Sequence, residues 1–297
     1  MTSIHDRVAA ARHRLRDAGL APDEADLSAR ILAEHVLGWS TEQFFTNGFE
    51  PEPDGFGATY AAAVARRAAR EPLPYITGER EFWGLTFEVT PDVLIPRPET
   101  EIIVEAALEA IPQRAAAVRI ADACTGSGCI GIAIATERPA ASLLATDISA
   151  AALHVARRNA IRHGVADRVQ FIQTDLLDGV AGPFDVIVAN PPYVRSGDRN
   201  GLQPEVREEP AVALYAGPEG LDAIARLVRD ASPRLRADGF LIFEFGLGQD
   251  LEIERLIRDN DQLAFVELRR DLQGIARTAV ARQRPVRSRE SGNLVIG

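Results

Sequence analysis

The chain has 297 residues, of which 46% are hydrophobic and 26% charged, and it carries a net charge of −10 with arginine as its only strong base. This composition predicts a globular protein with room for two domains, and the acidic balance argues against general affinity for a phosphate backbone. No apolar run reaches about 18 residues, and the N-terminus has no basic-then-apolar leader. We therefore expect a cytoplasmic enzyme.

Metal and disulfide chemistry find little support in the sequence. Cys124 and Cys129 lie five positions apart and are the only two cysteines, so neither a disulfide framework nor a four-cysteine zinc site can form. The five histidines show no ligand spacing. We expect no bound metal.

Residues 1–72 carry a helical pattern. A second helix is expected to open at Asp23, a short third at Ser40 or Thr41, and a long fourth after the proline-rich loop near residue 53. The apolar residues at helical spacing are Ile4, Val8, Ala11 and Leu15, then Leu27, Ile31, Leu32 and Val36, then Tyr60, Val64 and Ala69. This small bundle is either a packing accessory or a domain that grips a macromolecular substrate.

Residues 73–112 are expected to form a β-hairpin linker and a connecting helix. Residues 82–90 alternate like a strand, and Pro91-Asp92 predicts the turn before residues 93–95. The helix is expected to be capped near Thr100. Arg97 lies between two prolines, which suits an anion contact or an ion pair with Glu99 or Glu101 equally well.

The third unit, residues 113–284, begins with a strand, a glycine-rich turn and a helix. Residues 118–123 are apolar, residues 129–135 begin a helix, and the turn between them is Cys124, Thr125, Gly126, Ser127 and Gly128. Backbone amides at such a helix start can approach a ligand closely because glycine has no Cβ. On its own this motif is a weak signal for a nucleotide site.

Later strands strengthen that signal. Residues 143–147 end in Asp147, about 20 residues after the loop, where a carboxylate can accept both ribose hydroxyls. Residues 168–175 end in Asp175, and a helix over 150–163 lies between these two strands. Strands and helices that alternate in this way predict a parallel, doubly wound sheet with its ligand across the carboxyl ends of the strands.

S-adenosylmethionine fits this loop better than a dinucleotide does. The three-glycine fingerprint for a pyrophosphate is incomplete, and hydride transfer needs neither Asp175 nor the segment after the fourth strand. We expect Asp147 to bind the ribose, Asp175 and Leu176 the adenine, and the loop from Thr125 to Gly128 the amino-acid end. Asp122 orients the loop, contacts the ammonium group of the ligand through its backbone neighbours, or lies behind the site as a supporting carboxylate.

The segment Asn190-Pro191-Pro192-Tyr193 follows the apolar strand 184–188. Two consecutive prolines cannot donate to a sheet ladder, so the strand must stop at Asn190 and leave its amide facing outward. An amide, a rigid turn and an aromatic ring thus meet at a strand end. The polar stretch 195–210 that follows is expected to act as a lid or clamp, strands are expected at 239–245, 265–268 and 277–282, and the tail 285–297 is expected to be disordered.

Taken together, these segments resemble the HemK/PrmC family of protein-(glutamine-N5) methyltransferases. The resemblance covers nearly the whole chain and includes residues 75–78, 81–83, 94–101, the glycine-rich loop, 190–193, 207–210 and 271–274. It implies an α/β fold: a seven-stranded Rossmann-like class I methyltransferase sheet with its last strand antiparallel, a helical N-terminal domain and a hairpin linker. It also implies S-adenosylmethionine as methyl donor, class I peptide chain release factors as partners, and neither membrane contact nor stable nucleic-acid binding.

The resemblance predicts how the reaction proceeds. An amide nitrogen is a poor nucleophile, so positioning for in-line transfer is central. We expect Asn190 Oδ1 and the Pro191 carbonyl to accept the two N–H bonds of the glutamine in the Gly-Gly-Gln motif of the release factor. Pro192 stiffens the turn, Tyr193 lies over the planar amide, and Asn190 also borders the methyl donor.

Three alternatives stay open. The run 124–129 resembles relatives that methylate a glutamine of ribosomal protein L3, so L3 is the nearest rival substrate. The Asn-Pro-Pro-Tyr tetrapeptide also occurs in adenine-N6 methyltransferases of nucleic acids, which would need a base-flipping pocket and a basic groove. A non-catalytic translation-factor binding module is the third possibility.

Overall fold

The computed structural model describes residues 2–285, and the predicted disordered tail lies outside the described residues except for Pro285. In this range no helix is both long and apolar enough to cross a membrane. The α-helices are α1 (Ile4–Asp17), α2 (Pro22–Leu37), α3 (Thr41–Asn47), α4 (Phe56–Ala68), α5 (Leu73–Thr77), α6 (Glu101–Ala110), α7 (Cys129–Glu137), α8 (Ala150–Arg162), α9 (Ala211–Leu214), α10 (Asp222–Ala231) and α11 (Asp250–Arg258). The strands are β1 (Glu79–Phe82), β2 (Leu85–Glu88), β3 (Arg119–Ala123), β4 (Ser142–Asp147), β5 (Val169–Gln173), β6 (Phe184–Ala189), β7 (Leu235–Glu244), β8 (Leu263–Arg270) and β9 (Ala276–Gln283).

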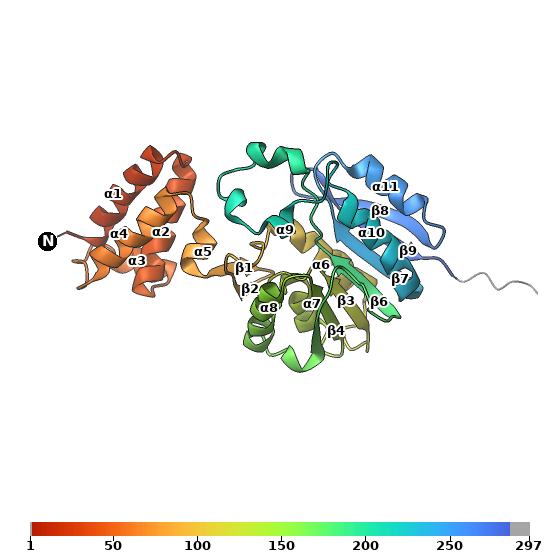
Figure 1. Cartoon of the computed structure of the whole chain (residues 1–297). Helices are drawn as coiled ribbons and strands as arrows, with labels where there is room; N and C mark the ends of the chain where they lie inside the picture. The colour runs from red at the N-terminus through yellow and green to blue at the C-terminus, as the bar shows by residue number, and fades with distance from the viewer. Residues whose placement is uncertain (1, 286–297) are drawn as a thin grey trace, which may run out of the picture.

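Helices α1 to α4 form a bundle that stands apart from the sheet, with α5 and the hairpin between them (Figure 1). Ser3 caps α1 and Ser40 caps α3, each in a reciprocal capping box. The predicted inner face of α2 was partly wrong, because Leu27 is 47% exposed. The buried face instead carries the small residues Ala25, Ser28, Ala29 and Ala33 together with Leu32.

The hairpin turns earlier than the sequence pattern predicted. Strands β1 and β2 pair across Phe82 and Leu85, so the turn is Trp83-Gly84 and not Pro91-Asp92. Both turn residues have positive φ, 55° for Trp83 and 68° for Gly84, as a two-residue hairpin turn that matches the strand twist requires. Alternation alone concealed this turn because Trp83 is bulky and apolar like its neighbours.

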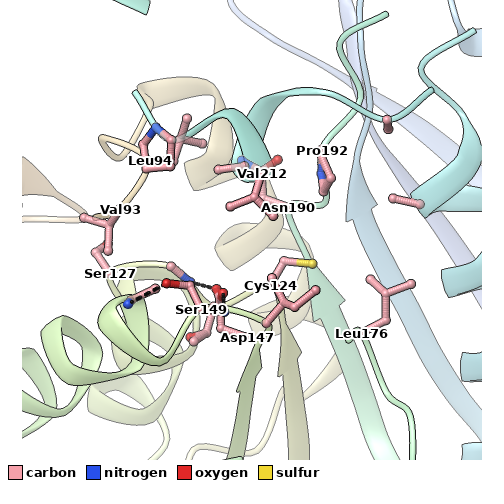
Figure 2. Close-up of a pocket in the computed structure, with 18 of the residues that line it drawn as sticks. Val93, Leu94, Cys124, Ser127, Asp147, Ser149, Leu176, Asn190, Pro192 and Val212 are labelled. Atoms are coloured by element: carbon pink, nitrogen blue, oxygen red, sulfur yellow. Dashed lines mark hydrogen bonds between the residues drawn. The ribbon is translucent and has the colours of Figure 1, made fainter. Parts of the chain in front are cut away.

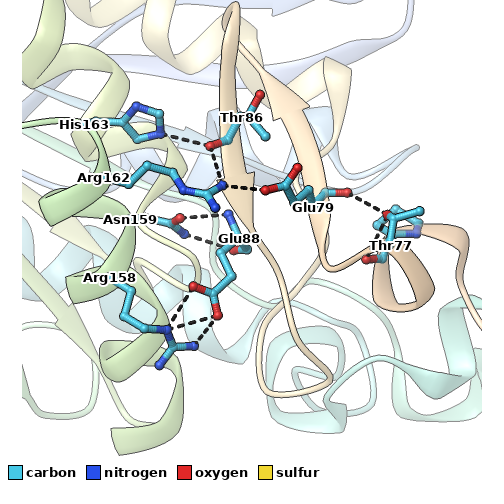
Figure 3. Close-up of polar contacts among 9 residues, drawn as sticks. Thr77, Glu79, Thr86, Glu88, Arg158, Asn159, Arg162 and His163 are labelled. Carbon is cyan, nitrogen blue, oxygen red and sulfur yellow. Dashed lines mark hydrogen bonds and ion pairs between the residues drawn. The ribbon is translucent and has the colours of Figure 1, made fainter. Parts of the chain in front are cut away.

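Helix α8 anchors the hairpin to the larger domain (Figure 3). The buried Asn159 side chain accepts a hydrogen bond from the Glu88 amide at 2.8 Å and donates to the Glu88 carbonyl at 3.0 Å. Its Nδ2 also donates to the Ser127 carbonyl at 2.9 Å. Arg158 adds an ion pair with Glu88 at 2.7 Å. The Asn159 side chain thus joins the hairpin linker at Glu88 to the glycine-rich loop at Ser127.

We expect Asn159→Ala to lower the free energy of unfolding by about 3 kcal/mol, because buried backbone groups at Glu88 and Ser127 lose their partners. Urea unfolding followed by circular dichroism measures this change. Asn200→Ala, at an exposed loop position, is the matched control and should stay within about 0.5 kcal/mol of wild type. Equal stability of the two variants would contradict the bridging role.

The large sheet has seven strands in the order β5, β4, β3, β6, β7, β9, β8. All neighbouring pairs are parallel except those of β9, which is antiparallel to both β7 and β8. The predicted seven-stranded sheet with a reversed last strand is therefore confirmed. Successive strand residues such as Ile120 and Ala121 pack into opposite cores, covered by α6, α7 and α8 on one face and by α10 and α11 on the other.

The strand order indicates where on the large sheet a ligand is expected to bind. The chain winds outward from β3 through β4 to β5, and then returns to β6 on the other side of β3. Ligands of such sheets lie at the carboxyl ends of the strands where the winding direction reverses. The segments after β3, β4 and β6 meet at that point.

Candidate active site

Two cavities meet at Asn190. The first has a volume of about 350 Å³ and is lined by residues 124–127 of the glycine-rich loop, the end of β4, and residues 92–94, 96 and 97. The second, of about 470 Å³, is lined by Tyr193, Glu244, Arg277 and part of the loop after β6. Asn190 lines both cavities, and Figure 2 shows it beside Pro192 and Val212 above the glycine-rich loop.

The glycine-rich loop depends on left-handed backbone. Cys124, Gly126 and Gly128 have φ of 59°, 55° and 84°. At φ of 84° any residue with a Cβ would be strained at Gly128, and its Cβ would also lie 2.7 Å from Ile132 Cδ1, so glycine is favoured where α7 begins. Gly128 therefore supports the loop from behind and does not line the first cavity, whereas the other four loop residues do.

Two aspartates hold this loop in place, Asp122 fully buried and Asp147 half-buried. Asp122 Oδ2 accepts from Thr125 Oγ1 at 2.6 Å and from the Gly131 amide at 3.1 Å, and burial raises the pKa of Asp122 to about 7. Asp147 accepts from the Gly126 amide and from the Ser149 amide, each at 2.9 Å. Burial also raises the pKa of Asp147. Asp122 thus orients the loop, one of the three roles that the sequence left open.

The first cavity fits S-adenosylmethionine. Ser127 Oγ lines it and is buried without a hydrogen-bond partner, so a polar ligand atom can satisfy it. Each Asp147 oxygen accepts one backbone bond and can accept a second from a ribose hydroxyl. Gly126 faces open space, with nothing within 4 Å of a built Cβ.

The corner of the first cavity expected to hold the adenine has one acidic and one aliphatic residue. Asp175 and Leu176 both line the first cavity. One oxygen of Asp175, Oδ2, pairs with Arg226 at 2.8 Å. Leu176 has φ of 52° and is 4% exposed, and it offers an aliphatic wall.

The Asn-Pro-Pro-Tyr segment divides between the two cavities. Strand β6 ends at Ala189, and Asn190 Nδ2 donates to Thr100 Oγ1 at 3.2 Å. Pro192 lines the first cavity and Tyr193 the second. Pro191 is buried and lines neither.

Sequence reasoning missed or misassigned several neighbours of this segment. Arg97 pairs with the buried Glu209, not with Glu99 or Glu101. Thr100 is the N-cap residue of α6, as the sequence predicted, but its hydroxyl makes no cap bond and donates to Glu244 at 2.6 Å instead. The signal for Glu244 was present in the sequence as an acid inside the apolar run 241–245.

The loop after β6 connects the helical bundle with the second cavity. Residues 202, 203 and 206 line that cavity, and Glu205 pairs with Arg67 and Arg70 of the bundle, each at 2.8 Å. Arg67 is only 2% exposed. The helical bundle therefore holds this loop, although Arg67 and Glu205 lie 138 positions apart in the sequence.

The reversed last strand, the glycine-rich loop and the carboxylate that ends β4 define the class: this is a class I S-adenosylmethionine-dependent methyltransferase. The family of PrmC N-terminal domains matches residues 7–78, and the methyltransferase small domain family matches residues 100–207. A crystal structure of a methyltransferase from Pyrococcus furiosus shares the fold, with 17% identity and a TM-score of 0.51 over 77% of this chain and all of its own.

Relatives define the family more narrowly. The release factor glutamine methyltransferase of Nitratidesulfovibrio vulgaris is 41% identical over 92% of both chains. That of Deinococcus radiodurans is 38% identical over 97% of this chain and 99% of its own. The chain belongs to the release factor glutamine methyltransferase family.

Proposed function

We propose that this enzyme transfers the methyl group of S-adenosylmethionine to the side-chain amide nitrogen of a glutamine in class I peptide chain release factors. The observation that carries the proposal is the place of Asn190, at the junction of the two cavities and after the fourth strand in chain order of the large sheet. A donor in the first cavity and a glutamine side chain in the second would meet at this amide. Because release factors act on the ribosome, the proposed site of action is the cytoplasm.

The residues of the site serve mainly to position the amide. When bound, S-adenosylmethionine supplies a methyl group activated by a sulfonium. Asn190 Oδ1 accepts one N–H bond of the glutamine amide, which directs the nitrogen toward the first cavity and stabilises the positive charge that develops on it. The proposal assigns the second N–H bond to the carbonyl of Pro191, although this residue is buried and lines neither cavity in the structure. Pro192 fixes the turn and Tyr193 bounds the amide from the second cavity. The surplus proton leaves to water.

We propose that the helical bundle, residues 1–72, recognises the release factor. Residues 73–112 are the linker in this proposal, and residues 113–284 are the catalytic domain. The support for this role of the bundle is the pairing of Glu205 with Arg67 and Arg70, which connects the bundle to the loop beside the second cavity. A substrate that contacts the bundle would thereby touch the wall of the site.

We expect Glu205→Ala to lower kcat/KM for the release factor about tenfold, equivalent to about 1.4 kcal/mol, because the loop loses its contact with the bundle. Arg67 keeps its ion pair with Glu24, so the fold should survive. Steady-state methylation with varied release factor measures the effect. Glu208→Ala, at an exposed position of the same loop, is the control, and an equal kcat/KM for both variants would refute the connection.

The direct test of the proposed function supplies labelled S-adenosylmethionine together with one candidate acceptor at a time. The acceptors are a release factor, its Gly-Gly-Gln→Gly-Gly-Ala variant, ribosomal protein L3 and duplex DNA. Label on the intact release factor alone supports the proposal. Label on L3 or on DNA would overturn it.

A further inference from the structure

Behind Asn190, three hydrogen bonds lead to a buried carboxylate. Asn190 Nδ2 donates to Thr100 Oγ1 at 3.2 Å, and Thr100 Oγ1 donates to Glu244 Oε2 at 2.6 Å. The Tyr193 hydroxyl donates to the other oxygen, Glu244 Oε1, at 2.9 Å. Glu244 is 2% exposed and lies on β7, while Thr100 directly precedes α6.

The Glu244 carboxylate determines which atoms donate in these hydrogen bonds. Both oxygens of Glu244 accept a hydrogen bond, one from Thr100 and one from Tyr193, so the single proton of the Thr100 hydroxyl is committed to Glu244. The Thr100 oxygen can then only accept from Asn190. The Asn190 amide must therefore turn its NH₂ toward Thr100 and leave Oδ1 for other partners.

We propose that Thr100 and Glu244 are positioning residues that fix the orientation of the Asn190 amide, so that the site presents an acceptor and selects a substrate amide over a carboxylate. This inference rests on the proposed function and adds to it the origin of the preference for glutamine over glutamate. A glutamine offers N–H donors to Asn190 Oδ1, whereas a glutamate carboxylate would face it with a second acceptor.

The burial of Glu244 supports this role. The pKa of Glu244 is raised, with burial as the largest cause, and the hydrogen bonds from Thr100 and Tyr193 and the charge of Arg277 oppose only part of that shift. A buried carboxylate is costly unless its hydrogen bonds are satisfied, and an apolar residue at this strand position would pack without that cost. The carboxylate therefore holds the two hydroxyl groups that donate to it. One belongs to Tyr193, which lines the second cavity, and the other to Thr100, which holds Asn190 at the junction of both cavities.

The test compares Thr100→Val, Thr100→Ser and Glu244→Gln with wild type. Thr100→Val removes the acceptor for Asn190. The carboxamide introduced by Glu244→Gln can donate to Thr100, which frees the threonine proton to turn toward Asn190 and reverses the amide. We expect either change to lower kcat about 10- to 100-fold, the scale typical of outer hydrogen-bond partners of an active group, and Thr100→Ser to restore most of it.

A binding readout separates orientation from general damage. Calorimetry gives the affinities for a release factor with Gly-Gly-Gln and for its Gly-Gly-Glu variant. Wild type should prefer glutamine, and Thr100→Val and Glu244→Gln should lose that preference when all variants are compared at a temperature where circular dichroism shows each of them folded. The melting temperature of Thr100→Val should fall, because the buried Glu244 loses one hydrogen bond, and Thr100→Ser should restore it. The control is Thr136→Val, because the Thr136 hydroxyl bonds only within α7, to the Ala133 carbonyl at 2.7 Å.

The outcomes are distinct. An unchanged preference and kcat in Thr100→Val and Glu244→Gln would overturn the orienting role while leaving the proposed function intact. A loss of kcat that follows melting temperature and that Thr100→Ser does not rescue would also overturn it. A wild-type enzyme that neither binds nor methylates the release factor would instead refute the proposed function together with this extension of it.

Discussion

Asn190→Ala should lower kcat for release factor methylation by about 100- to 1,000-fold, the cost of removing one group that stabilises charge in a transition state. The physical reason is that the alanine variant has no side-chain oxygen to hold the glutamine N–H or to oppose the positive charge on nitrogen. The donor should still bind, because the loop 124–128 and Asp147 are unchanged. Single-turnover methylation and calorimetry with S-adenosylmethionine measure the two quantities.

The matched control for this variant is Asn260→Ala. Asn260 is also partly buried and bonds through its amide, but it lies at the end of α11 and lines neither cavity. It should keep near-wild-type turnover. Near-wild-type turnover of Asn190→Ala with an intact donor affinity would contradict the role that we assign to this residue.

Asp147→Ala should raise the dissociation constant for S-adenosylmethionine by about 100-fold, because loss of hydrogen bonds to a charged group costs about 3 kcal/mol. Two losses combine. The ribose hydroxyls lose their acceptor, and the Gly126 and Ser149 amides lose the carboxylate that holds the loop. Calorimetric titration with the donor measures the change without any protein substrate.

Asp167→Ala serves as the control for the donor site, because Asp167 is exposed and lines neither cavity. Its donor affinity should equal that of wild type. If Asp147→Ala binds S-adenosylmethionine as tightly as Asp167→Ala does, the ribose assignment is wrong.

Local patterns in the sequence were sufficient for most of the fold. The alternation of apolar strands and amphipathic helices predicted the parallel sheet, because each element must bury one face. Glycines at 126 and 128 predicted the loop, since they supply the positive φ that its path requires. The family resemblance added the reversed last strand, which β9 confirms.

The remaining features depend on contacts between distant segments, which no local pattern encodes. The partner of Arg97 is Glu209, 112 positions away, and Thr100 meets Glu244 across 144 positions. The hairpin turn at Trp83-Gly84 was missed because the alternation of side chains continues through it. The face of α2 was misplaced because small residues, and not the larger Leu27, allow close packing of the bundle.

The central claim is that a glutamine amide of the release factor receives the methyl group. Its most direct measurement is tandem mass spectrometry of a release factor incubated with this enzyme and S-adenosylmethionine. We predict the mass of one added methyl group on the glutamine of the Gly-Gly-Gln motif, and we expect it to form about 100- to 1,000-fold more slowly with Asn190→Ala than with the wild-type enzyme. A methyl group on any other residue, or none on that glutamine while another acceptor is methylated, would contradict the account.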